Sequence, residues 1–278
     1  MFSINQIYLN LDRHLSYAEL LNFLKHDKQS LSQAKKHLDV CRDCWDIWNK
    51  VRWDSCMNSV GVSELKEYLG DQFIPYFDSS VSLAVNWYNS EPKTPEEVAE
   101  FYKNTHDYIY NLVIWHESGD REDFLSEFKQ LSEKYGVSSF LDYGCGVGND
   151  GLALINSGYS VSFVDYSCPS TDFLLWRMKK RGIHSEIIDI EKNEILPSAD
   201  VFFAIDVLEH IQDPLQVLKK INNKTKIFAH RSQFGNKAGG RHPFHFDFDE
   251  SSLNEELVRM GFHKIESKYL SSWLRQTD

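Results

Sequence analysis

The sequence has no run of about 18 consecutive apolar residues, the length that a helix needs to cross a bilayer. No basic segment followed by an apolar one comes after Met1, so we expect no signal peptide, no membrane partner and a cytoplasmic location. Positive charge is also scarce, since 30 Lys and Arg residues against 41 Asp and Glu residues leave a formal net charge of -11. This balance argues against broad binding to a nucleic-acid backbone.

Cysteine is sparse too, with five residues, two of which form a Cys-x-x-Cys pair at Cys41 and Cys44. Without an export signal, this pair favours metal binding over a disulfide. The apolar content of 42% and the aromatic content of 14% still allow a full core. We expect a helical domain over 1–58, a helical connector over 59–134 that contributes to the acceptor pocket, and an α/β core over 135–278.

A glycine-rich turn lies at the centre of that core. The apolar run over 137–141 predicts a buried strand, and a helical pattern follows from about residue 152. Between them stand Gly144, Gly146 and Gly148. A strand, a glycine turn and a helix together present backbone N–H groups and a helix N-terminus to a ligand. The sequence therefore predicts a nucleotide-like site at this turn.

The turn departs from the dinucleotide pattern G-x-G-x-x-G, because Asn149 stands where the third glycine is needed. Asp142 precedes the first glycine, and its carboxylate suits a cationic ligand better than a pyrophosphate. The order D-x-G-x-G-x-G resembles motif I of the class I S-adenosylmethionine (SAM) methyltransferases. This resemblance implies SAM as the cofactor, with Asp142 and the glycine backbone holding its methionine portion.

Two further strands are predicted to end in acidic residues. Asp165 ends the run over 161–165, and at that place a carboxylate can accept both hydroxyls of a ribose, with Tyr166 beside it. Asp189 and Ile190 follow the third strand. The resemblance implies that Asp189 binds the adenine amino group while Ile190 packs on the ring.

The fourth strand, expected over 200–205, leads into Asp206-Val207-Leu208-Glu209-His210-Ile211. This order resembles the corresponding loop of ubiquinone-biosynthesis-type and related small-molecule methyltransferases, which places Asp206 and Val207 at the cofactor. Polar residues at the carboxyl end of a central strand face the ligand crevice. Glu209 and His210 are therefore candidates for the acceptor side, and hydrogen bonds that only fix the loop are the alternative.

A histidine-rich turn follows the fifth strand and contains His242, His245 and Asp247. A histidine here can act as a general base, hydrogen-bond the loop, or join a metal site with its neighbours. Our order of preference for acceptor-side residues is His245, His242, Glu209, His210. A helix expected from Thr94 brings further candidates for this pocket, namely Tyr102, His106, Tyr108 and Tyr110.

The N-terminal helices contain the pattern His37-x-x-x-Cys41-x-x-Cys44. One imidazole and two thiolates at this spacing suit tetrahedral zinc, which needs a fourth ligand. His14 is the best candidate, His26 is the alternative, and Cys56 is a poorer one. Capping boxes are expected at Ser16 and Ser30. The pattern His14 … His37 … Cys41 … Cys44 resembles the zinc-binding anti-sigma-factor fold, and we expect a structural zinc ion.

The expected architecture is thus a Rossmann-like class I methyltransferase sheet with an N-terminal all-α zinc-binding domain and a helical cap. The expected function is methyl transfer from SAM to a nucleophile on a small molecule or peptide. Transfer to tRNA or protein is one alternative, favoured if Lys237, Arg241 and 179–181 form a basic surface. A non-catalytic protein that docks a partner through the zinc module is another. The sequence leaves the oligomeric state open.

Overall fold

The computed structural model describes residues 13–193, 196–221, 223–235 and 243–276. The chain divides into two compact units. Unit 1 contains Met1–Asp78 and Ile114–Arg121, and unit 2 contains Ser79–Val113 and Glu122–Asp278. The three-part division expected from the sequence stays a prediction. No helix in the described part of the chain combines the length and the hydropathy needed to span a membrane.

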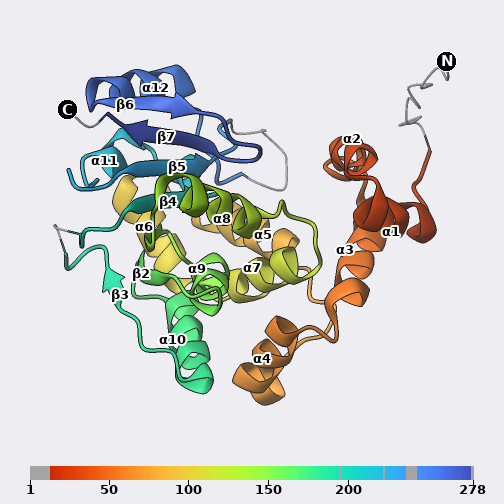
Figure 1. Ribbon diagram of the computed structural model, residues 1–278. Helices are drawn as coiled ribbons and strands as arrows, with labels where there is room; N and C mark the ends of the chain where they lie inside the picture. Colours follow the sequence, from red (N-terminus) through yellow and green to blue (C-terminus); the bar gives the residue numbers. More distant parts are fainter. Residues whose placement is uncertain (1–12, 194–195, 222, 236–242, 277–278) are drawn as a thin grey trace. The chain divides into compact units, whose positions relative to one another are not determined.

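Unit 1 is helical (Figure 1, red to orange). Its elements are α1 (Tyr17–His26), α2 (Lys28–Leu38), α3 (Arg42–Cys56), α4 (Val60–Leu69) and the short 3-10 helix η1 (Gly70–Gln72). The capping box at Ser16 is confirmed, because its hydroxyl accepts from Glu19 N while the Glu19 carboxylate accepts from Ser16 N. The cap expected at Ser30 is wrong. The side chain of Asp27 accepts from Ser30 N and starts α2 three residues earlier.

The helices of unit 1 share an apolar core. Buried leucines of α1 and α2 pack with tryptophans of α3, and the cluster includes Leu20, Leu24, Leu31, Ala34, Leu38, Trp45 and Trp48. These positions recur every three or four residues, which is the spacing that places side chains on one helix face. The small core explains why further stabilisation by a bound metal would matter here.

Unit 2 begins with α5 (Ser79–Ser90), α6 (Pro95–Asn104), α7 (Asp107–Glu117) and α8 (Phe124–Tyr135). The helix start expected at Thr94 is confirmed, and Thr94 forms a capping box with Glu97. The single long helix expected from Thr94 is wrong, because Thr105 is extended and its hydroxyl donates to the Phe101 carbonyl, which ends α6. The last four residues of α7 belong to unit 1.

A seven-stranded sheet follows, and its strand order is β3-β2-β1-β4-β5-β7-β6. The strands are β1 (Ser139–Tyr143), β2 (Ser160–Asp165), β3 (Ile187–Asp189), β4 (Val201–Ile205), β5 (Ile227–Arg231), β6 (Phe262–Ile265) and β7 (Ser271–Arg275). All neighbours are parallel except β7, which is antiparallel to both β5 and β6. This arrangement confirms the Rossmann-like sheet.

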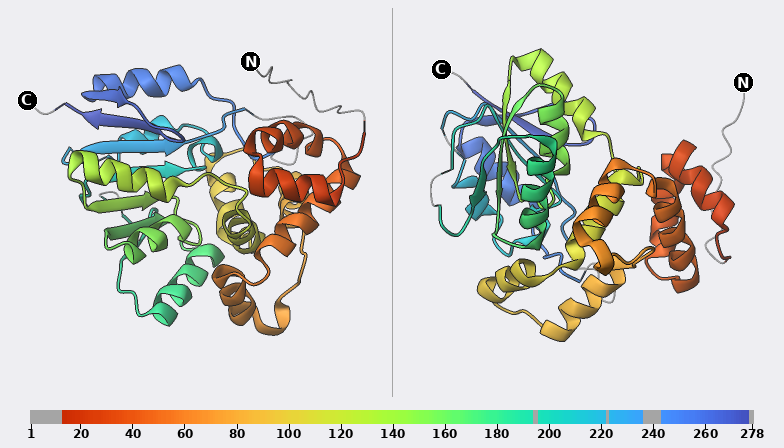
Figure 2. Two further views of the ribbon diagram at one scale, coloured as in Figure 1. Left: turned by 45° about the vertical axis from the view of Figure 1, so that its right-hand side comes forward. Right: turned by 90° about the horizontal axis from the view of Figure 1, so that it is seen from below.

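Helices cover both faces of the sheet (Figures 1 and 2). They are α9 (Asn149–Asn156), α10 (Pro169–Arg181), α11 (Leu215–Leu218) and α12 (Glu250–Arg259), with a 3-10 turn η2 (Leu208–His210) after β4. Phe140 and Phe203 pack with α8, α9 and α10, whereas Leu141 and Phe202 pack with α11 and α12. Adjacent residues of a strand thus enter different cores, as the two-residue repeat of a strand requires. The strand order reverses between β1 and β4, which is where such sheets bind ligands.

Candidate functional site

The glycine turn joins β1 to α9 at this reversal. Gly144, Gly146 and Gly148 have φ values of +71°, +51° and +72°, a backbone region that L side chains rarely adopt. A Cβ atom on Gly144 would lie 2.4 Å from the Val207 side chain. Gly148 is the N-cap of α9, so the turn directs the start of this helix toward the carboxyl ends of the strands.

Asp142 and Asp165 hold the backbone around the turn. Asp142 is buried, and its Oδ2 accepts from Gly151 N at 3.2 Å. Asp165 ends β2, where Oδ2 accepts from Gly146 N and Oδ1 from Tyr166 N, both at 2.7 Å. Desolvation raises the pKa of the Asp165 carboxyl to about 6. The structure therefore brings both predicted acids to the same turn.

Asp189 lies next to Asp165 in the parallel pairing of β2 with β3. Its carboxylate pairs with Lys192 Nζ at 2.7 Å and accepts from Glu191 N, and the bond to Lys192 lowers its pKa. Ile190 N donates to the Asp165 carbonyl at 3.0 Å. Tyr166 and Ile190 are half-buried. Four residues predicted to bind the cofactor thus lie together at the carboxyl ends of β2 and β3, namely Asp165, Tyr166, Asp189 and Ile190.

Asp206 follows β4 in the left-handed backbone region, with φ +51°. Arg231 at the end of β5 holds it twice, through an ion pair with the carboxylate and through a bond from Asp206 N to the Arg231 carbonyl. This double contact stabilises a conformation that is unfavourable for a residue with a Cβ atom. The side chain of Val207 then packs against Gly144, so the loop after β4 contacts the glycine turn.

The predicted acceptor-side residues Glu209, His210 and His245 form a second cluster. Each offers one ligand atom, and the three atoms lie within 4.8 Å of one another. Glu209 is 1% exposed and accepts from Gln233 N at 3.1 Å, and burial raises its pKa. Burial lowers the pKa of His210 to about 4, so this imidazole is neutral near pH 7. His242 lies outside the described residues.

Aromatic side chains surround this cluster. Tyr102 of α6 places its hydroxyl 3.0 Å from His210 Nδ1. Phe244 packs against Trp87 and the His210 ring, and its carbonyl lies 3.3 Å from the same nitrogen. Tyr102 was among the predicted candidates, whereas Trp87 was not, because its stretch shows no clear hydrophobic period. Helices before the glycine turn thus contribute side chains to this cluster.

Arg177, which lies just before the basic stretch 179–181, is not among the residues predicted for the site. It is buried, and its guanidinium donates to the Val147 carbonyl and to Asn149 Oδ1 at 2.6 and 2.8 Å. Asn149 in turn donates to the Leu112 carbonyl at 3.0 Å. These bonds connect α10 and α7 to the glycine turn, and only its tertiary position distinguishes Arg177 from its exposed neighbours.

In unit 1, three of the four predicted metal ligands converge. His14, Cys41 and Cys44 have ligand atoms within 4.8 Å of one another, and His14 Nδ1 lies 3.4 and 3.5 Å from the two sulfurs. His37 Nε2 lies 3.2 Å from Cys44 Sγ, although His37 falls outside that group. His26, at the end of α1, and Cys56, at the end of α3, are not part of it either.

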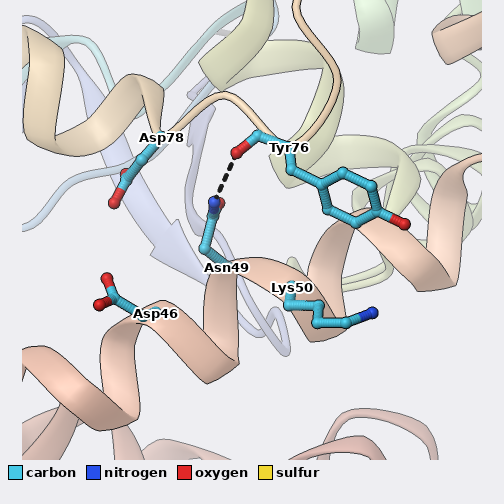
Figure 3. A pocket seen from close by; sticks show the side chains of 5 residues that line it. All are labelled: Asp46, Asn49, Lys50, Tyr76 and Asp78. Atoms are coloured by element: carbon cyan, nitrogen blue, oxygen red, sulfur yellow. Dashed lines mark hydrogen bonds between the residues drawn. The ribbon is translucent and has the colours of Figure 1, made fainter.

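A hollow of about 490 Å³ lies elsewhere in unit 1. Figure 3 shows its lining residues, Asp46, Asn49, Lys50, Tyr76 and Asp78. Much of its polar surface is already engaged, since Asn49 Nδ2 donates to the Tyr76 carbonyl at 3.0 Å and Trp45 Nε1 donates to Asp78 at 2.7 Å. None of the predicted site residues lines this hollow.

Comparison with known proteins agrees with the fold. Residues 141–227 match the family model of a methyltransferase domain. A search of curated proteins finds no significant match.

Solved structures with a similar fold include magnesium protoporphyrin IX methyltransferase from Synechocystis with bound S-adenosylhomocysteine (SAH). It has 14% identity and a TM-score of 0.46, over 79% of this chain and 96% of that one. TehB from Haemophilus influenzae has 16% identity and a TM-score of 0.46, and the match covers 59% of this chain and 66% of TehB. The PH0226 protein from Pyrococcus horikoshii has 20% identity and a TM-score of 0.42, and the match covers 55% of this chain and 90% of PH0226.

The family match, the strand order and the glycine turn with its acids define a class I SAM-dependent methyltransferase domain in unit 2. The protein is therefore an enzyme of the methyltransferase class.

Proposed function

We propose that this enzyme transfers the methyl group of SAM to a nucleophilic atom of a small molecule or peptide. The observation that carries the proposal is the position of Asp165, a desolvated carboxylate at the end of β2 that also binds Gly146 N in the glycine turn. A carboxylate there can accept hydrogen bonds from both ribose hydroxyls. An acidic, half-buried acceptor fits a ribose and does not fit a phosphate.

The other predicted cofactor residues have roles in the same site. Asp142 and the backbone of Gly144, Gly146 and Gly148 hold the methionine portion, with Asp206 and Val207 bordering it. Tyr166 accompanies Asp165 at the ribose. Asp189 and Ile190 bind the adenine, and the bond from Ile190 N to the Asp165 carbonyl keeps the two parts of the site in register.

SAM supplies an activated methyl group on a sulfonium, so the protein's main tasks are alignment and the exclusion of water. Glu209, His210 and His245 belong to the acceptor side. Tyr102 and Phe244 fix the orientation of the His210 ring.

We also propose that His14, His37, Cys41 and Cys44 hold a structural zinc ion. Zn–S bonds of about 2.3 Å and Zn–N bonds of about 2.0 Å separate tetrahedral S and N ligands by roughly 3.5 Å. The S–N distances of 3.2–3.5 Å are close to that value. Leu15 N also donates to Cys44 Sγ at 3.1 Å, as expected for a thiolate ligand with a fixed orientation.

Calorimetric titration with SAH, with NAD in parallel, tests the cofactor. We expect SAH alone to bind, and binding of NAD alone would overturn the proposal. Incubation with methyl-labelled SAM and pools of small molecules or peptides then tests transfer. Label that appears only in tRNA or in large proteins would contradict the proposed acceptor class.

A further inference from the structure

The acceptor-side cluster contains a buried acid whose hydrogen bonding is incomplete. Glu209 is 1% exposed, and Oε1 accepts from Gln233 N. Oε2 is buried without a hydrogen-bond partner among the described residues. A buried carboxylate oxygen in this state is costly, so such an atom calls for a cation or another donor that binds there.

Two imidazoles lie beside that carboxylate. One ligand atom from each of Glu209, His210 and His245 fits within 4.8 Å of the others. The His210 and His245 rings approach edge to face, with centroids 4.8 Å apart. Two histidines and one carboxylate form a donor set that binds divalent transition metals.

The surroundings of His210 match those of a metal ligand. A histidine that binds a metal through one nitrogen usually donates its other N–H to a carbonyl or carboxylate. His210 Nδ1 lies 3.3 Å from the Phe244 carbonyl and 3.0 Å from the Tyr102 hydroxyl. In the tautomer with hydrogen on Nδ1, the lone pair is on Nε2.

The other carboxylate of the loop, that of Asp206, differs from Glu209 because it already has a cationic partner. It stands three positions before Glu209, and Arg231 neutralises it through an ion pair. Phe246 N donates to the backbone carbonyl of Glu209 at 2.7 Å. This bond holds the neighbouring residue His245 beside Glu209. The loop after β4 and the segment after β5 therefore present their ligands from two directions.

We propose that Glu209, His210 and His245 bind one divalent transition-metal ion, and that this ion receives a hydroxyl oxygen of the methyl acceptor. The inference deepens the proposed function and rests on it for the acceptor. The ion lowers the pKa of the bound hydroxyl, whose proton leaves to water. The oxygen lone pair then forms the bond to the methyl carbon, while the S–C bond breaks, its electron pair returns to sulfur and SAH leaves.

Mn²⁺ is the probe for the test, because carboxylate and imidazole ligands bind it whereas a thiolate site prefers zinc. The full chain first receives one equivalent of zinc, which the two thiolates of unit 1 bind in preference to a site without sulfur, and unbound zinc is then removed. Electron paramagnetic resonance then follows the loss of the free Mn²⁺ signal on titration. We expect saturable binding at about one ion per chain. Wild-type protein that leaves the signal unchanged overturns the proposal.

Glu209→Gln and His245→Gln each remove one ligand and should weaken Mn²⁺ binding about tenfold or more. Glu96→Gln changes an exposed carboxylate at the start of α6 and should leave the titration unchanged. Equal affinity in all three variants overturns the assignment, and the wild-type titration decides by itself if both ligand variants fail to fold.

SAH titration of the same samples separates the two proposals. SAH binding without Mn²⁺ binding refutes the metal site alone. Mn²⁺ binding that the two ligand variants weaken, without SAH binding, supports the site and refutes the cofactor.

Discussion

The hydroxyl group of Tyr102 lies 3.0 Å from Nδ1 of His210, although 108 positions separate the two residues. Tyr102 belongs to α6 and His210 to the turn after β4. The bond therefore joins a helix that precedes the glycine turn to the turn that follows β4. Burial raises the pKa of Tyr102, so the phenol stays protonated and can donate to or accept from the ring nitrogen.

Replacement of Tyr102 by phenylalanine tests this bond. We expect Tyr102→Phe to lower the free energy of unfolding by about 1 kcal/mol, because His210 loses a buried partner. Urea denaturation measures the change. Tyr88→Phe is the matched control, since Tyr88 is 49% exposed and its substitution should cost less than about 0.5 kcal/mol. Equal losses in the two variants would show that the bond contributes nothing specific.

The role of Asp165 is tested by Asp165→Ala. A ribose that loses a charge-assisted hydrogen bond should bind more weakly by about 1.5–3 kcal/mol, or roughly 10- to 150-fold in Kd for SAH. Calorimetry measures the change. Asp150→Ala, at a half-buried position in the first turn of α9, is the control and should retain most of the affinity. Unchanged affinity in Asp165→Ala would assign the ribose to another residue.

The raised pKa of Asp165 predicts how the affinity for SAH depends on pH. The carboxyl has a pKa of about 6, and only its ionised form accepts from two ribose hydroxyls. Affinity should therefore be constant above pH 7 and fall by about tenfold per pH unit well below 6. In Asp165→Asn this dependence should disappear. A wild-type affinity that stays flat from pH 7.5 to 5 would mean that Asp165 is already ionised at pH 5.

Removal of zinc should affect unit 1 selectively. A chelator should increase amide hydrogen exchange over 14–53 and leave the strands of the sheet protected, because the metal supplies part of the folding free energy of the small helical core. Hydrogen-exchange mass spectrometry with metal analysis measures both effects. Cys41→Ser should lose zinc, whereas Cys56→Ala, at the far end of the helix that Cys41 caps and outside the His14–Cys41–Cys44 group, should retain it. Protein purified without chelator and free of zinc would refute the site.

Gly151 should tolerate no larger side chain. Its Cβ atom would lie 2.1 Å from Cε1 of Phe163, which is fully buried in β2. We expect Gly151→Ala to destabilise unit 2 by about 1–3 kcal/mol through overpacking, as measured by thermal unfolding. Gly61→Ala is the comparison, because the atom that it meets is the end of the flexible Glu117 side chain. A smaller cost at Gly151 than at Gly61 would contradict this reasoning.

Much of the sheet could be predicted because its signals are local. Each of β1, β2 and β4 is a short apolar run, and glycines or acidic residues mark where the first two end. The boundary of α2 was harder, since Asp27 and Ser30 are both good caps and only the folded chain shows which one is used. No proline or glycine marks the end of α6 at Thr105, so the sequence pattern favours one continuous helix from Thr94.

Glu209, His210 and His245 could be proposed one by one from the sequence, but their grouping could not. The loop motif placed Glu209 and His210 at the end of β4, and the family resemblance pointed to His245. Their convergence within 4.8 Å depends on how the segment after β5 folds back, which no local pattern records. The same holds for Arg177, whose burial follows from the packing of α10 against the glycine turn.

Helix α7 contributes Asp107–Val113 to one compact unit and Ile114–Glu117 to the other. The boundary between the units is therefore crossed three times by the chain, and no single proteolytic cut or terminal deletion can release either unit whole. A deletion of residues 1–78 would leave behind 114–121, including the almost fully buried Ile114 and Asp120. The N-terminal module is thus better probed by point substitutions at its metal ligands than by excision.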